Sequence, residues 1–160
     1  MTSPSFSLTR RQYMLAGASA SLLAAGPALA ATLPAPTSLP DALAAALKNA
    51  SPLVVMTSLV GCPFCAIARD NYLAPLQGQL GLLIVQVDMR NRDMVKDFSG
   101  ASQSQDQLIR NWGIKVAPTV LFFGRGGLEV AERLVGGYIP DFYGAYLDDR
   151  LRTARAAVAG

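Results

Sequence analysis

The sequence contains no histidine in 160 residues. Because histidine is the usual general base and a common metal ligand, its absence excludes Ser-His-Asp and Cys-His nucleophilic sites, histidine-ligated metals and histidine-ligated haem. Cysteine is almost as scarce, with only Cys62 and Cys65. Two cysteines cannot form a disulfide framework, so any sulfur chemistry is confined to this pair.

Charged side chains are also few, at 16% of the chain. There are 14 Lys and Arg residues against 11 Asp and Glu, and two of the arginines are adjacent at Arg10 and Arg11. The rest of the chain is close to neutral and has no basic stripe with interleaved aromatics, so nucleic acid is not an expected partner. The length predicts one domain, and an apolar content of 51% can fill its core.

The first forty residues carry no charge except Arg10 and Arg11. An uncharged run rich in Ala, Ser, Leu and Gly follows over 14–31, with an A-x-A-type cleavage site that ends at Ala30. The local string Thr-Arg-Arg-Gln-Tyr-Met-Leu resembles the twin-arginine export consensus. We predict an export signal over 1–30, removed after Ala30, and a periplasmic mature protein. An uncleaved membrane anchor is the alternative to a cleaved signal, and the general secretory route is the alternative to the twin-arginine route.

The rest of the chain alternates helical and strand patterns. After an extended linker over 31–39, a single domain is expected over 40–152, with a fraying tail over 153–160. The predicted helices are 41–50, 63 to about 73 with Pro75 marking the end, 106–112, and 140 to about 152. The predicted strands are 52–60, 82–88, 119–123 and 128–135, with a hairpin turn at 124–127. The connection over 89–105 contains at most a helical turn near 94–98. A βαβ unit followed by a ββα unit predicts an α/β sandwich with a mixed sheet.

Cys62 and Cys65 lie where a buried strand gives way to a helix. Unpaired N–H groups and the macrodipole at a helix N-terminus stabilise a thiolate, so this position favours the reactive form of Cys62. Cys65 follows nearly one turn later and is close enough to resolve a mixed disulfide. Pro63 suits the first helical turn, where its missing N–H has no partner to lose. A C-x-x-C pair beside a βαβ pattern indicates redox chemistry.

Other uses of the two cysteines have less support. A zinc site needs four ligands, so it would require a dimer or carboxylates, and a c-type haem needs His where Ala66 stands. A purely structural disulfide across so short a loop would stabilise little. Such a structural disulfide would fit the alternative to an enzyme, which is a non-enzymatic binding or assembly module.

Pro118 is the second candidate site residue. It follows the apolar Val116 and Ala117 and precedes a buried strand that starts at Thr119. An ordinary proline at the entry to a strand would account for it. A cis-proline packed against the cysteines would, in addition, leave the backbone of Ala117 open to pair with a strand of a partner.

Together, Gly-Cys-Pro-Phe-Cys at 61–65, Val-Ala-Pro-Thr at 116–119 and the later Gly-Gly turn resemble the thioredoxin superfamily. The resemblance covers residues 40–152 and implies a three-layer α/β sandwich, with a central mixed four-stranded sheet flanked by helices. Cys-Pro-Phe-Cys is similar to the motif of glutaredoxins. With an insertion at 97–100 and an aromatic-rich segment at 140–143, the chain is most similar to exported bacterial thioredoxins of sulfur-oxidation operons, the SoxS/SoxW type.

The resemblance also implies the roles of particular residues. In that superfamily the first cysteine attacks and the second resolves, which assigns these steps to Cys62 and Cys65, and the cis-proline maps onto Pro118. The residues beside them are expected to contact the partner: Gly61, Pro63, Phe64, Ala117 and Thr119.

The implied activity is that of a thiol–disulfide oxidoreductase that reduces disulfides of exported proteins. It needs no bound cofactor or metal and is re-reduced by a membrane electron donor. A disulfide-donating oxidase with the same site is the alternative. Two departures stand out, because cytosolic thioredoxins have Trp at the position of Gly61 and a buried aspartate at the position of Met56. The usual group for proton transfer is therefore missing.

Overall fold

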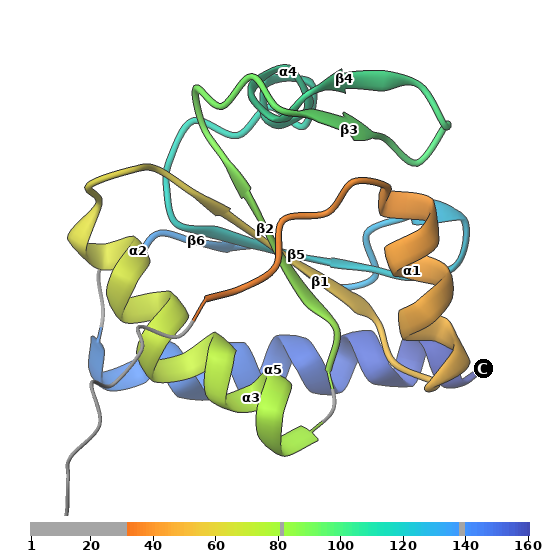
Figure 1. The fold of residues 1–160 in the computed structure, drawn as a ribbon. Helices are drawn as coiled ribbons and strands as arrows, with labels where there is room; N and C mark the ends of the chain where they lie inside the picture. Colours follow the sequence, from red (N-terminus) through yellow and green to blue (C-terminus); the bar gives the residue numbers. More distant parts are fainter. Residues whose placement is uncertain (1–31, 81, 138–139) are drawn as a thin grey trace, which may run out of the picture.

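The computed structural model describes residues 32–80, 82–137 and 140–160, so the predicted export signal over 1–30 lies outside the described residues. Its centre is a four-stranded sheet in the order β2-β1-β5-β6 (Figure 1). The strands are β1 (Leu53–Ser58), β2 (Ile84–Asp88), β5 (Thr119–Phe123) and β6 (Leu134–Val135). β1 is parallel to β2 and antiparallel to β5, and β5 is antiparallel to β6. The mixed four-stranded sheet expected from the sequence is confirmed.

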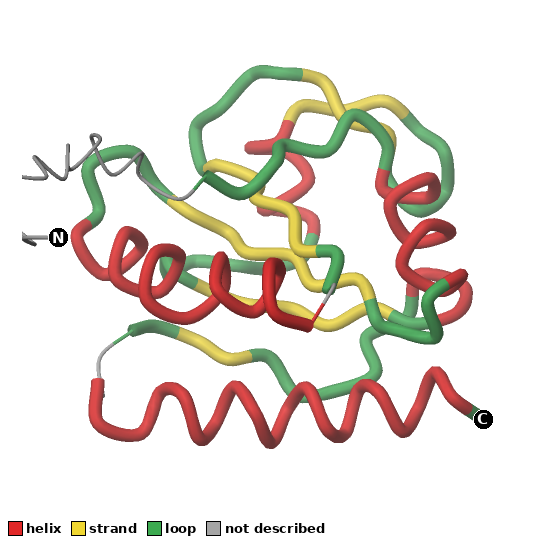
Figure 2. Tube along the Cα trace, turned by 60° about the horizontal axis from the view of Figure 1, so that its bottom comes forward, coloured by secondary structure: helices red, strands yellow, loops and turns green. Residues whose placement is uncertain are grey.

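Helices cover both faces of this sheet (Figures 1 and 2). One face carries α1 (Leu39–Lys48) and α4 (Gln105–Asn111). The other carries α5 (Pro140–Ala159) and one continuous helical run composed of α2 (Pro63–Ile67), the π-helical turn η1 (Ala68–Leu73) and α3 (Ala74–Leu80). The result is the three-layer α/β sandwich of thioredoxin-like proteins.

Alternating side chains of β1 supply both halves of the core. Val54 and Met56 face α2 and α5 in the cluster that also contains Cys65, whereas Leu53 and Val55 face α1 and α4. Every residue of β1 is buried, because helices lie on both sides of the strand. This burial explains why the sequence shows a continuous apolar run here rather than an alternating one.

The segment over 32–38, expected to be a linker, packs along β2, the edge strand of the sheet. The Pro34 carbonyl accepts a hydrogen bond from the Gln86 N–H of β2 at 2.9 Å, and the Thr37 carbonyl accepts one from the N–H of Lys96, in the connection after β2, at 3.0 Å. Leu33 is buried in the cluster that contains Cys65. The segment therefore covers an edge that would otherwise expose unpaired backbone groups.

The connection over 89–105 differs from its prediction. In place of a helical turn near 94–98, β3 (Met94–Lys96) and β4 (Ser102–Ser104) form a short antiparallel hairpin. The Asp97 carboxylate holds its turn by accepting hydrogen bonds from the N–H groups of Ser99 and Ala101, at 2.9 and 3.0 Å. Val95 alone of the three β3 residues is buried, a period-two pattern too short to recognise in the sequence.

The helical run after Cys62 does not end at Pro75, as the sequence predicted, but continues to Leu80. The backbone widens just before the proline, where the Ala74 N–H donates to the Arg69 carbonyl five residues back. Such a π-helical turn changes the hydrogen-bond pattern locally, so a residue that lacks an N–H is tolerated.

The last helix was also predicted too short. α5 extends to Ala159, seven residues beyond the expected end at Arg152. Ala154 and Val158 are buried, so the Ala-rich end packs against the domain instead of fraying. The apolar positions in this stretch are mostly alanines, and their small side chains gave little helical periodicity in the sequence.

The expected strand over 128–135 is mostly irregular, with only β6 and an isolated bridge between Phe123 and Glu129 paired to the sheet. A short 3-10 turn, η2 (Arg125–Gly127), precedes it. Gly127 has a positive φ of 70°, and a Cβ added there would lie 2.5 Å from Cγ and 2.7 Å from Cβ of Phe98. The ring of Phe98 packs on Phe123 with a centroid distance of 4.6 Å, so it has little freedom to retreat.

Gly127→Ala is therefore expected to destabilise the fold more than Gly126→Ala. Gly126 has a similar φ of 72° but no atom within 4 Å of an added Cβ, so it is a matched control. The left-handed conformation should cost about 1–2 kcal/mol in both variants, and the clash with Phe98 should add about 1–3 kcal/mol at Gly127 alone. Urea unfolding measures both, and equal losses of stability would show that Phe98 does not confine this turn.

Candidate active site

The candidate site begins where β1 ends at Ser58. The chain turns through an exposed Gly61, whose φ of 77° lies in the left-handed region that favours glycine. The Cys62 N–H donates to the Leu59 carbonyl at 3.1 Å and closes this turn. Cys62 thereby becomes the N-cap residue of α2, the strand-to-helix position that the sequence predicted.

Cys62 and Cys65 form a disulfide, with a Cα–Cα distance of 5.3 Å. The two sulfurs have different surroundings. The Cys65 N–H points at the Cys62 sulfur, with a distance of 3.2 Å between N and Sγ, and Cys62 is half-buried. Cys65 is only 1% exposed. After reduction, a partner could therefore reach the sulfur of Cys62 but not that of Cys65.

The segment before β5 lies against this disulfide. The Ala117–Pro118 peptide bond is cis, as predicted. The Ala117 carbonyl oxygen lies 3.9 Å from the Cys62 sulfur. The Pro118 carbonyl accepts a hydrogen bond from the Gly136 N–H at 2.7 Å. Among the described residues, the Ala117 N–H donates no hydrogen bond.

Thr119 is held inside the molecule rather than at the rim. It is 1% exposed, and its hydroxyl donates to the Val116 carbonyl at 2.7 Å. Its N–H donates to the Thr57 hydroxyl oxygen and its carbonyl accepts from the same hydroxyl, both at 3.2 Å. Thr119 therefore affects partner binding only indirectly, by fixing the turn over 116–119.

The other residues expected to contact a partner lie around the disulfide. Gly61, Pro63 and Phe64 are exposed, with Phe64 at 45%, and Ala117 is half-buried. Gly137 also lies at the site, although no pattern in the sequence marks it as a site residue. A Cβ at Gly137 would lie 3.3 Å from Cβ of Phe64 and 3.4 Å from Cγ of Pro118, so a side chain there would crowd both site residues.

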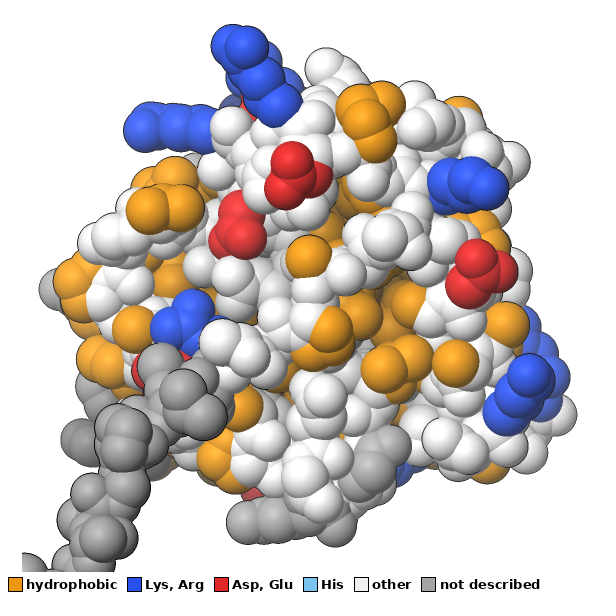
Figure 3. All heavy atoms as spheres, in the orientation of Figure 1, with side chains coloured by type: hydrophobic (Ala, Val, Ile, Leu, Met, Phe, Trp, Pro, Cys, Tyr) orange, Lys and Arg blue, Asp and Glu red, His pale blue; other side chains and the backbone are white. Residues whose placement is uncertain are grey.

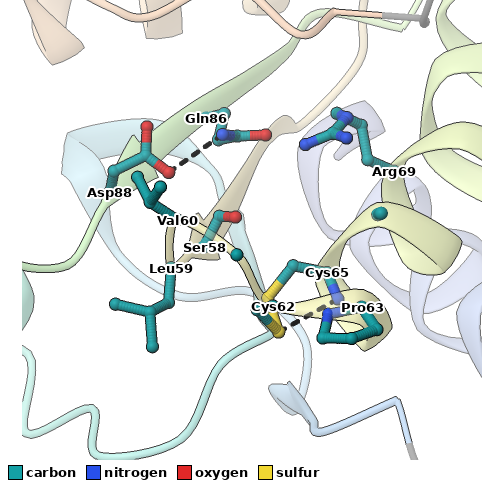
Figure 4. A pocket seen from close by; sticks show the side chains of 11 residues that line it. Ser58, Leu59, Val60, Cys62, Pro63, Cys65, Arg69, Gln86 and Asp88 are labelled. Atoms are coloured by element: carbon teal, nitrogen blue, oxygen red, sulfur yellow. Dashed lines mark hydrogen bonds between the residues drawn. A yellow bond between two sulfur atoms is a disulfide. The ribbon is translucent and has the colours of Figure 1, made fainter.

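A pocket of about 350 Å³ opens on the other side of the disulfide (Figure 4). Polar side chains from β1 and β2 line it, together with the two cysteines and Arg69. The Gln86 side-chain N–H donates to the Asp88 carboxylate at 2.9 Å. No motif in the sequence marks Ser58, Gln86 or Asp88 as site residues. Their proximity to the cysteines depends on the pairing of β1 with β2.

Arg69 is half-buried, and its Nε donates to Asp70 at 2.8 Å. Elsewhere on the face drawn in Figure 3, acidic and basic side chains are scattered rather than gathered by sign. No group of three or more possible metal-ligating side chains comes together in the part of the chain that the structure describes.

A disulfide at a helix N-terminus, facing a cis-proline across the end of a mixed sheet, defines a thioredoxin-type oxidoreductase fold. The family comparison agrees: the model of the thioredoxin-like domain matches residues 39–151, and the chain belongs to that family. No curated protein matches the sequence.

Solved structures share the fold at low sequence identity. Thioredoxin O2 from Arabidopsis thaliana in its oxidised state is 16% identical with a TM-score of 0.51, covering 77% of this chain and 97% of its own. A structure described as DsbH oxidoreductase is 18% identical with a TM-score of 0.52, covering 81% and 92% respectively. These similarities support the fold, and the Cys62–Cys65 pair supports thiol–disulfide chemistry on it.

Proposed function

We propose that the protein is a thiol–disulfide oxidoreductase that reduces disulfides in partner proteins. The observation that carries the proposal is the asymmetry of the cysteine pair: Cys62 caps the helix with a reachable sulfur, and Cys65 is buried behind it. A helix N-terminus stabilises the thiolate, which is the form that attacks disulfides.

The reaction has two exchanges. The Cys62 thiolate attacks one sulfur of the partner's disulfide, whose S–S bond breaks to release one partner thiolate and form a mixed disulfide. Cys65 then loses its proton and attacks the Cys62 sulfur. This step expels the second partner thiolate and leaves Cys62–Cys65 oxidised. The partner gains two electrons from the pair, and its two thiolates take up protons from water.

An extended partner segment fits the rim of the site. Val60 is 88% exposed, and Phe64 and Val116 are also exposed, so apolar side chains lie near the reachable sulfur. The Ala117 backbone next to Cys62 is placed to form hydrogen bonds with an added strand. Pro63 and Gly61 complete this surface in the proposal.

The direction of electron flow is tested by two assays on one preparation. As a reductase, the protein with dithiothreitol should accelerate the reduction of insulin, and its oxidised form should transfer its disulfide poorly to reduced, unfolded ribonuclease. The opposite pattern would identify a disulfide-donating oxidase, because the preferred direction follows from the reduction potential of the pair. A protein inactive in both assays would be a binding module.

We further propose that the mature protein works in the periplasm, within the SoxS/SoxW type, on an exported protein and with a membrane donor that restores its thiols. Support comes from the sequence over 1–30 and from the Cys-Pro-Phe-Cys motif. In the described part of the chain, no helix has both the length and the apolar character needed to cross a membrane.

Export has its own prediction. In a bacterium with a twin-arginine pathway, the mature protein should begin at Ala31, and the double change Arg10→Lys, Arg11→Lys should block its export. N-terminal sequencing and cell fractionation measure these results. Unchanged export of the double variant would assign the protein to the general secretory route, whereas a membrane-bound protein that keeps Met1 would contradict the cleaved signal.

A further inference from the structure

Resolution of the mixed disulfide requires Cys65 to lose a proton in a buried place. A thiol attacks as the thiolate, yet Cys65 is 1% exposed, so bulk water reaches it poorly. A positioned acceptor would speed this step. The core beneath Cys65 offers no such acceptor, because the apolar Met56 packs in the cluster that contains Cys65. The buried polar side chains of the described residues are all uncharged: Thr57, Ser58, Gln105 and Thr119.

The other ionisable groups near Cys65 are unsuited to accept its proton. Tyr143 belongs to the same cluster, but burial raises its pKa, so it stays protonated at neutral pH. Arg69 lines the pocket beside the disulfide, but a guanidinium is always protonated in proteins. Asp88 is the one carboxylate among the described residues that line this pocket.

The register of the sheet places Asp88 beside Ser58, and both line the pocket that Cys65 also lines. Ser58 pairs with Asp88, and Met56 pairs with Gln86, in the parallel ladder between β1 and β2. Paired residues on adjacent strands lie about 4.8 Å apart, and side chains two residues apart share a face. Since Met56 faces the cluster that contains Cys65, Ser58 and Asp88 project from the same face of the sheet.

Two hydrogen bonds fix Asp88 in this position. Its carboxylate accepts from the Gln86 side chain at 2.9 Å, and its N–H donates to the Gln105 side-chain oxygen at 2.7 Å. Figure 4 shows Ser58 between the disulfide and the Gln86–Asp88 pair. The pocket of about 350 Å³ has room for water molecules that would connect these groups.

We propose that Asp88 accepts the proton of Cys65 during resolution, through the Ser58 hydroxyl and water in the pocket. The Cys65 thiol gives its proton to this chain, which passes one to the Asp88 carboxylate. The Cys65 sulfur then donates its electron pair to the Cys62 sulfur, and the partner leaves as a thiolate. Asp88 later returns the proton to water. In this proposal Asp88 acts on the Cys65 sulfur only through the Ser58 hydroxyl and water. It is therefore a positioning residue rather than a catalytic one.

The inference rests on the proposed function, and single-turnover kinetics test the two separately. Dipyridyl disulfide is an uncharged probe that releases one coloured thiopyridone when Cys62 attacks and a second when Cys65 resolves. When the probe is mixed in excess with the reduced protein, Asp88→Asn should keep the rate of the first phase and slow the second by about 100-fold or more. Ser58→Ala, which removes only the intervening hydroxyl, should slow the same phase.

Asp148→Asn, the same chemical change on the exposed surface of α5, is the matched control and should leave both phases unchanged. A second phase that is equally fast in Asp88→Asn and Asp148→Asn overturns the relay and leaves the proposed function standing. A slowing of both phases in Asp88→Asn also overturns it, because a disturbed site would act on both attacks. If the unaltered protein releases no thiopyridone at all, the proposed function fails and the relay with it.

Discussion

Replacing Cys62 with serine is expected to abolish disulfide reduction, with a loss on the order of 10³-fold or more in insulin turnover. A serine hydroxyl is not ionised at neutral pH and cannot form the mixed disulfide. Cys65→Ser should lose turnover to a similar extent, but for a different reason, because its first exchange still proceeds and only the second is blocked. Insulin precipitation in the presence of dithiothreitol measures both variants.

The two cysteine variants need a control for folding. Serine is close to cysteine in size, and the Cys62 position is only half-buried, so the fold should survive that change. Urea unfolding of both variants in the reduced state checks this expectation. Full turnover by either folded variant would mean that the cysteine pair is not the site of the reaction.

The second large effect concerns the reactivity of the two thiols. Near neutral pH, Cys62 in the Cys65→Ser variant should react with iodoacetamide about tenfold faster or more than Cys65 in the Cys62→Ser variant. Cys62 accepts the N–H of residue 65 at the start of α2, whereas Cys65 is buried in the cluster with Met56. Mass spectrometry over a time course measures the rates.

Unfolding supplies the matched control for this comparison. In concentrated urea both thiols are equally exposed and lose the helix, so the two variants should react at similar rates. A Cys65 thiol that reacts faster than Cys62 in the folded protein would reverse the assigned roles. Equal rates in the folded state would show that the start of α2 does not activate Cys62.

The parts of the site that lie close together in the sequence were predictable. The buried strand, the break at Gly61 and the C-x-x-C pair are adjacent, so the strand-to-helix junction follows from local pattern. The cis bond before Pro118 was predicted because a proline stands between an apolar segment and a buried strand. The order of the predicted helices and strands, a βαβ unit followed by a ββα unit, gave the fold class and its mixed sheet.

Features that depend on distant segments were not predictable in the same way. Asp88 approaches the cysteines only because β2 pairs with β1 in one particular register. Gly137 matters only because the chain after β6 lies close to both Phe64 and Pro118. The π-helical turn before Pro75 has no sequence pattern of its own, so the proline was interpreted as the end of the helix.

The central claim is that Cys62 attacks a partner and Cys65 releases it. The most direct test incubates the reduced Cys65→Ser and Cys62→Ser variants with the same disulfide-bonded protein, quenches free thiols, and maps the adducts by mass spectrometry without reduction. The account predicts a stable mixed disulfide at Cys62 in the first variant and almost none at Cys65 in the second. A partner linked to Cys65, or no adduct in either variant, would contradict it.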